Sequence, residues 1–131
     1  MQQVSLLVIV LCLTACAMTH APDDLGRVPV EVRVVRSLPS IAGVEIAGRV
    51  IGPNVIQVVS GFETNVGVIA HELVHVTQWH RIGPSFPIVY IAQVIARGYL
   101  DAPLEVEARE LAETDFYRSW ARDVIARGGA W

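Results

Sequence analysis

Residues 66–79 read VGVIAHELVHVTQW, and this stretch decides how the rest of the chain is interpreted. It is apolar on nearly all sides, which is typical of a helix buried in a small domain. A helix places His71 and His75 four residues apart on one face, where two imidazoles can bind one metal ion. Glu72 turns toward the same side, close enough to accept a proton from a water molecule that the metal activates. A divalent cation would also compensate the charge of this carboxylate.

Two histidines leave such a site one ligand short, because catalytic zinc usually has three protein ligands and one open position. His80 lies nine residues after His71, on the opposite side of the helix, and we expect it at the surface or the helix end. Residues 103–112, PLEVEARELA, are a better source of a ligand. This segment is typical of the beginning of a helix, with Asp101 as a candidate N-cap and Pro103 in the first turn.

Glutamates of this second helix compete for the role of third ligand. At about 100° per residue, the apolar stripe of the helix is centred on Leu104, Ala108 and Leu111. Glu107 lies at the border of that stripe, whereas Glu105 and Glu110 point farther away. We therefore expect Glu107 to be the inward-facing ligand, with Glu105 in reserve. The alternative is that all of these carboxylates form a solvated acidic turn.

The helix motif with Gln78 three residues after His75, followed by Pro-Leu-Glu-Val-Glu-Ala at 103–108, resembles the small gluzincin-type metallopeptidases. These include the minigluzincins and bacterial metallopeptidase domains with a His-Glu-Leu-x-His-x-x-Gln helix. The resemblance covers roughly residues 55–115. It implies that His71, His75 and Glu107 bind zinc and that Glu72 is the general base in peptide-bond hydrolysis.

One position departs from the thermolysin-like members of that group. They carry an acidic residue four positions after the third ligand, where Leu111 stands in this chain. The carboxylate that would orient a histidine is therefore not assigned. The reaction also needs a donor for the developing oxyanion. Tyr99 is the nearest candidate by sequence position, followed by Tyr90 and Tyr117, although each tyrosine could equally be a packing residue.

The amino-terminal residues predict where the protein resides. Residues 4–15 form a short apolar stretch, and no charged side chain occurs before Asp23. This length fits the core of a signal peptide rather than a membrane-spanning helix. The stretch ends in Leu-Thr-Ala followed by Cys16, which resembles the bacterial lipobox, whose cysteine is lipidated. We therefore expect a signal peptide over residues 1–15.

A lipid anchor on Cys16 would hold the protein at a membrane of the bacterial cell envelope. Ala17 after the cysteine implies, by analogy with enterobacterial sorting, the outer membrane and a domain facing the periplasm. The alternative is an ordinary secretory signal cleaved near Ala17 or Ala21. The chain has two cysteines, Cys12 and Cys16, so the folded body has none and no disulfide. Residues 16–27 lack apolar periodicity and are expected to form a tether.

Residues 28–131 suffice for one compact domain of the α+β class. Residues 28–36 alternate apolar with charged side chains, and 44–51 and 55–60 are β-branched runs. We expect a small antiparallel or mixed sheet packed on a zincin-like active-site helix, followed by two further helices. Residues 55–60 are the candidate edge strand for an extended substrate, although a strand just before the helix could equally be central.

The two further helices are expected at about residues 88–97 and 104–127. The first has apolar residues at helical spacing, which we expect to belong to the core rather than to insert into a membrane. These residues are Ile88, Ile91, Ala92, Ile95 and Ala96.

The expected partner is a peptide or protein substrate. A formal net charge of −3 without a basic cluster argues against nucleic acid. Two other readings remain open. The chain could be a catalytically inactive envelope lipoprotein that acts as a binding module around a structural metal site, although such a site has no need of Glu72. It could also be a metal-free interaction protein in which both histidines are core residues.

Overall fold

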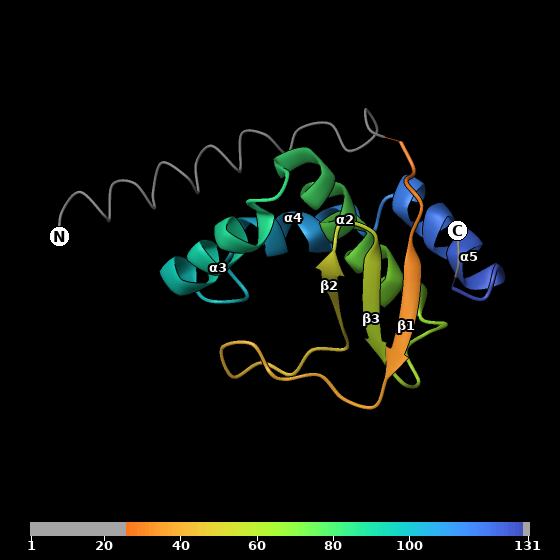
Figure 1. Ribbon diagram of the computed structural model, residues 1–131, viewed down its shortest axis with the longest axis horizontal. Coiled ribbons are helices and arrows are strands. Elements are labelled where there is room, and N and C mark those ends of the chain that lie inside the picture. The colour runs from red at the N-terminus through yellow and green to blue at the C-terminus, as the bar shows by residue number, and fades with distance from the viewer. Residues whose placement is uncertain (1–25, 130–131) are drawn as a thin grey trace, which may run out of the picture.

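The computed structural model describes residues 26–129, and one layer of it is a three-stranded mixed sheet (Figure 1). The strands are β1 (Glu31–Val35), β2 (Gly48–Gly52) and β3 (Val55–Val59), in the order β1-β3-β2. Strand β3 runs parallel to β1 and antiparallel to β2. It is therefore central, which was the alternative stated for residues 55–60, and their assignment as an edge strand is wrong. Burial explains the central position of β3, because its Ile56 and Val58 side chains are completely buried against the helices.

Four helices accompany the sheet in the described part of the chain, and the predicted α+β class is confirmed. They are α2 (Val66–Ile82), α3 (Phe86–Arg97), α4 (Pro103–Leu111) and α5 (Asp115–Ala126). Helix α2 begins after Asn65, whose side-chain oxygen accepts a hydrogen bond from the Val68 N–H at 3.0 Å. It ends at Gly83, which has a φ of 89° that favours glycine. None of the helices within residues 26–129 is both long and apolar enough to cross a membrane.

The single final helix predicted over residues 104–127 is wrong, because the chain breaks between α4 and α5. Thr114 has extended backbone angles there, and its hydroxyl donates to the Leu111 carbonyl at 2.6 Å. Three helices therefore follow α2 instead of two. The break lets α4 and α5 pack against α2 in different directions, so that α5 reaches the sheet while α4 stays near the histidines.

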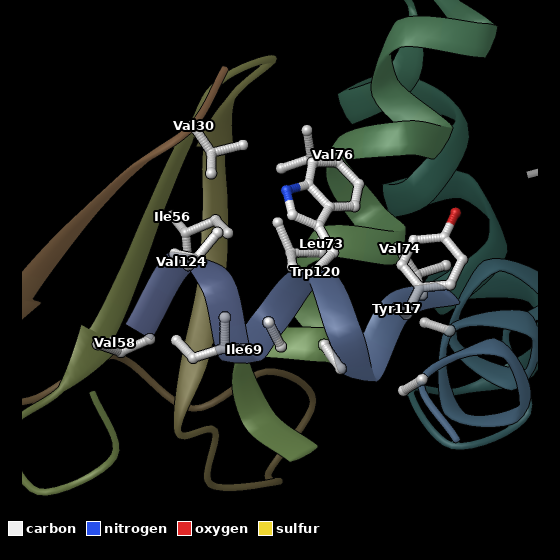
Figure 2. Close-up of a cluster of buried hydrophobic side chains, with 14 residues drawn as sticks. Val30, Ile56, Val58, Ile69, Leu73, Val74, Val76, Tyr117, Trp120 and Val124 are labelled. Atoms are coloured by element: carbon white, nitrogen blue, oxygen red, sulfur yellow. The ribbon is translucent and has the colours of Figure 1, made fainter. Parts of the chain in front are cut away.

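The main core lies between the sheet, α2 and α5. Figure 2 shows Ile56 and Val58 of β3 near Trp120 and Val124 of α5, with Leu73 of α2 beside them. All five side chains are fully buried. This core fixes α2 against the sheet and therefore determines where the polar face of α2 points.

The amino-terminal end of the described chain is fastened to α5. Arg27 donates hydrogen bonds to Asp123, at 2.5 Å, and to Ser119, at 3.1 Å. The prediction that residue 27 belongs to a free tether is therefore wrong. The predicted signal peptide and Cys16 lie outside the described residues, as does the tether up to residue 25.

Helix α3 differs from the expectation in the face that it buries. Ile88, Ile91 and Ile95 are 69%, 56% and 80% exposed, so the prediction that they belong to the core is wrong. The buried side chains of α3 are instead Phe86 and Val89, with Gln93. Both faces of this helix are apolar, so helical spacing by itself could not select the one that packs.

Candidate metal centre

Two histidines and one glutamate meet between α2 and α4. The His71 Nε2 lies 3.0 Å from Glu105 Oε2, and the His75 Nε2 lies 2.9 Å from Glu105 Oε1. One ligand atom of each residue can be chosen so that all three lie within 4.8 Å of one another. Two imidazoles and a carboxylate at this spacing are a donor set that suits zinc.

The structure brings Glu105, not Glu107, to the histidines. Glu105 is 2% exposed, whereas the Glu107 Oε1 accepts a hydrogen bond from Gln78 Nε2 at 3.1 Å. The expectation that Glu107 is the inward-facing carboxylate is therefore wrong. Glu105, the second candidate, occupies that position. The reason is the rotation of α4, whose buried residues include Glu105 itself and, at the end of the helix, Ala112 in place of Leu111.

The first turn of α4 is tied to both neighbouring helices, which fixes the position of Glu105. The Leu104 N–H donates to Gln93 Oε1 of α3 at 2.8 Å. The Leu104 carbonyl accepts from Gln78 Nε2 of α2 at 3.0 Å. Pro103 needs no such partner, since proline has no N–H. Gln93 thus accepts from a first-turn N–H in place of the side-chain cap that Asp101 was expected to provide, and Ala102 is the N-cap residue.

Gln78 also orients His75, which the sequence had left without a partner. Its Oε1 lies 2.7 Å from the His75 Nδ1, while its Nε2 faces two acceptors, the Leu104 carbonyl and Glu107. The amide oxygen can only accept, so the His75 Nδ1 carries a proton and donates it. The Nε2 is therefore the ring atom available to a metal. Glu107 supports this arrangement indirectly, by holding the amide of Gln78.

We expect Gln78→Met to weaken zinc binding by about 10- to 100-fold without abolishing it, because the His75 ring would lose the bond that fixes its tautomer and orientation. Titration of the chain with zinc against a competing chelator measures this change. Thr77→Val is the matched control, since the buried Thr77 hydroxyl donates to the Leu73 carbonyl and is not bonded to a histidine. Equal affinities for both variants would contradict the role of Gln78.

Glu72 is buried beside the histidines with one oxygen unpaired. The side chain is 5% exposed, and its Oε2 has no hydrogen-bond partner among residues 26–129. Burial raises the pKa of Glu72, and the charges of His75 and His71 offset only part of that shift. A buried carboxylate with a free oxygen and a raised pKa is suited to accept a proton from a nearby water.

The charges of the cluster favour a cation between α2 and α4. Burial acts to lower the pKa of His75, but its hydrogen bond to Glu105 and the charge of that carboxylate outweigh burial and raise the pKa to about 9. Burial conversely acts to raise the pKa of Glu105, and the hydrogen bonds from His71 and His75 outweigh it, so that this pKa is lowered. Glu105 is therefore ionised at neutral pH and stabilises positive charge beside it.

Of the three tyrosines considered as oxyanion donors, Tyr90 contacts the cluster directly. Its hydroxyl donates to Glu105 Oε1 at 2.8 Å, and its ring is edge-on to His75 with centroids 5.8 Å apart. Burial and the charge of Glu105 raise the pKa values of both Tyr90 and Tyr99, so both hydroxyls keep their protons. Tyr117 is fully buried in the main core instead. His80 is exposed, as predicted.

Two cavities open on either side of Glu72. The first has a volume of about 260 Å³, and the second about 230 Å³. Gly48, Glu72 and Tyr99 line both, so the two cavities meet at the general-base candidate. The apolar lining of the first consists of Ile41, Val50, Trp79, Phe86, Pro87 and Ile91. The polar groups of the cluster are thus reached through a cleft that is apolar on one side.

Strand β2 forms one wall of this cleft, through Gly48, Arg49 and Val50. It is an edge strand, because β3 is its neighbour in the sheet and the other side of β2 faces no strand in the described part of the chain. The edge strand beside the cluster is therefore β2 rather than the predicted strand at 55–60.

Comparisons of the chain with protein-family models, with curated proteins and with solved structures found no match.

Proposed function

We propose that this chain is a zinc-dependent peptidase in which His71, His75 and Glu105 bind the metal and Glu72 is the general base. The observation that carries the proposal is the meeting of these four side chains between α2 and α4, at the junction of two cavities. The donor set fits zinc, and the unpaired oxygen of the buried Glu72 fits a water that approaches the same place. The metal is proposed to be Zn²⁺ because two imidazoles and one carboxylate leave a coordination position open.

Bound zinc would supply a Lewis acid that lowers the pKa of its water toward neutrality and polarises the scissile carbonyl. Glu72 would accept a proton from the attacking water and return it to the leaving amine. Gln78 would keep the His75 ring in the orientation that points its Nε2 at Glu105. Tyr99 lines both cavities together with Glu72, and its hydroxyl remains a proposed donor to the oxyanion. Tyr90, already bonded to Glu105, would hold that carboxylate in place.

A peptide would lie along the free edge of β2 in the proposed complex. Main-chain hydrogen bonds to an edge strand need no particular side chains, so they would hold many sequences in extended form. Selectivity would come from the first cavity, where Trp79 and Phe86 stack with ring centroids 5.0 Å apart. Because this wall is apolar, we expect a large apolar side chain next to the scissile bond.

We further propose that the protein acts at the bacterial cell envelope, held by a lipid on Cys16 at the outer membrane and facing the periplasm. The lipobox-like sequence before Cys16 supports this proposed location. Mass spectrometry of the protein isolated from bacterial membranes tests it. A diacylglyceryl-modified Cys16 as the first residue is expected, and an unmodified amino terminus near Ala17 or Ala21 would overturn it.

The test of the enzyme proposal is zinc content followed by hydrolysis of a peptide library. The full chain should contain about one zinc per molecule and cleave peptides. A chelator should stop cleavage, and added zinc should restore it. Zinc without cleavage by any peptide mixture would favour the binding module with a structural metal site. A folded chain that takes up no zinc would overturn the metal site itself.

Gly48→Ala should lower peptide hydrolysis by about tenfold while zinc binding is retained. A Cβ at position 48 would lie 3.1 Å from Glu72 Cγ and 3.3 Å from the Gln57 carbonyl oxygen, so the Glu72 side chain has to give by a few tenths of an ångström. A displacement of about 1 Å can cost about 100-fold in rate, and this smaller shift should cost correspondingly less. Initial rates on the best library peptide measure the effect.

Gly52→Ala is the control for that variant, because a Cβ added at position 52 of the same strand meets nothing within 4 Å. Its rate should equal that of the wild type. If Gly48→Ala is also fully active, Glu72 does not depend on close contact with β2, and the role given to this wall is wrong.

A further inference from the structure

Helix α3 exposes a row of isoleucines beside the cleft. Ile88, Ile91 and Ile95 follow one another at three- and four-residue spacing, which places them on one face of the helix. Each is more than half exposed, and so is Leu100 shortly after the helix. In Figure 1, α3 projects at the side of the molecule away from β1 and α5. The row is therefore accessible in the folded protein.

Few charged residues lie near this row along the sequence. From Gly83 to Leu100 the sequence contains no acidic residue, and Arg97 is its one charged side chain. Arg97 lies in the last turn of α3, about 150° around the helix from the isoleucines, and Asp101 directly follows Leu100. The isoleucine face itself is therefore uncharged, as is typical of the apolar face of a helix that lies in a bilayer interface.

We propose that the isoleucine face of α3 binds the surface of a lipid bilayer, with Ile88, Ile91 and Ile95 among the acyl chains. The helix would lie along the interface rather than cross it, since it has 12 residues. This inference stands apart from the proposed peptidase activity, because none of its steps uses zinc or hydrolysis.

The chain that precedes the described residues is long enough to allow this contact. Nine residues lie between Cys16 and Gly26, and an extended chain covers up to about 3.5 Å per residue, or roughly 35 Å from one to the other. A domain of about 100 residues has a radius of gyration of about 13 Å. A lipid on Cys16 would thus hold α3 within reach of the bilayer and raise its local concentration there.

A second copy of the chain fits the row less well. Four partly exposed side chains of roughly 100 Å² each offer about 400 Å², whereas a stable dimer buries about 800 Å² on each partner. A bilayer has no such minimum area, because each apolar side chain that enters it adds its own free energy of transfer.

Contact through this face would set the direction from which substrates arrive. Ile91 belongs both to the exposed row and to the lining of the first cavity. The cleft would therefore open next to the bilayer surface, and peptides that lie on that surface could reach it without crossing the aqueous phase.

The test uses the full chain with Cys12→Ser and Cys16→Ser, so that one introduced cysteine can carry an environment-sensitive fluorophore. The label is placed at Ile95→Cys or, as a matched control, at Val34→Cys, an exposed apolar position of β1. Vesicles of phosphatidylethanolamine and phosphatidylglycerol are prepared with and without a lipid that bears a quencher on its acyl chain. The label at position 95 should shift to the blue and be quenched, and the label at position 34 should do neither.

Adding Ile88→Ser and Ile91→Ser to the chain labelled at position 95 should weaken the partition of that label by about tenfold for each isoleucine. Ile51→Ser, at an exposed apolar position of β2, should leave it unchanged. The proposal is overturned if vesicle-bound protein shows no quenching at position 95, if positions 34 and 95 are quenched equally, or if the chain does not bind vesicles. It is also overturned if the label at position 95 shifts to the blue without vesicles, because a second copy or the amino-terminal segment would then cover the row.

Discussion

Glu105→Gln should remove zinc from the protein, whereas Glu107→Gln should leave about one zinc ion per chain. An amide binds zinc far more weakly than a carboxylate, so we expect affinity to fall by more than about 100-fold in the Glu105 variant. Glu105 lies within 3.0 Å of both histidine Nε2 atoms, while Glu107 contacts Gln78. Metal content by mass spectrometry, together with zinc titration against a chelator, measures the difference.

The pair of variants is informative because the two residues share a helix and a charge. Both lose one negative charge from α4, so a general electrostatic effect would appear in both. Circular dichroism should be used to check that the Glu105 variant is folded, because this side chain also accepts a hydrogen bond from Tyr90. Loss of zinc in the Glu107 variant with full binding in the Glu105 variant would show that the ligand set is wrong.

Glu72→Gln should lower kcat/KM for the best library peptide by about 10²- to 10⁴-fold while the chain still binds one zinc ion. Glutamine keeps the shape of the side chain but cannot accept and return a proton. The close approach of Gly48 to Glu72 Cγ holds the substituted side chain in the same place, so geometry changes little. Stopped assays with mass detection of the peptide products measure the rate, and metal analysis of the same sample measures zinc.

Glu45→Gln is the control for charge in the cleft, because Glu45 is an exposed carboxylate that lines the second cavity. Its kcat/KM should stay within about twofold of the wild type, as expected for a screened surface charge. Full activity of Glu72→Gln would exclude general-base catalysis by this residue. A comparable loss in both variants would attribute the effect to the charge of the cleft rather than to proton transfer.

Local spacing along the chain was enough to predict which face of α2 carries His71, Glu72 and His75. Within one helix the angle between His71 and His75 is fixed by geometry, and it depends on no other part of the protein. The strands were predicted for a similar reason, since alternation and β-branched runs are local properties of residues 28–36, 44–51 and 55–60. The order of these strands is not a local property, and the sequence did not place β3 at the centre of the sheet.

The third residue of the cluster depended on how α4 is rotated against α2. Taking Leu111 as a core residue put the apolar stripe on the side of Glu107. In the structure Ala112 is buried and Leu111 only partly so, which turns the apolar stripe toward Glu105 by about 30°. Glu105 and Glu107 lie about 160° apart, on opposite sides of the stripe, so a rotation of about 30° exchanges one glutamate for the other. The same ambiguity affected α3, where two apolar faces compete and the contacts of Phe86 decide between them.

The amino-acid pattern was sufficient to predict the helix that carries His71, Glu72 and His75 and the α+β class. The folded protein was needed to show that Glu105 completes the cluster, that Gln78 orients His75, and that β2 forms the wall of the cleft. Side chains on one element are related by the periodicity of that element. Relations between elements follow instead from packing, in which a small rotation of a helix changes which side chain faces its neighbour.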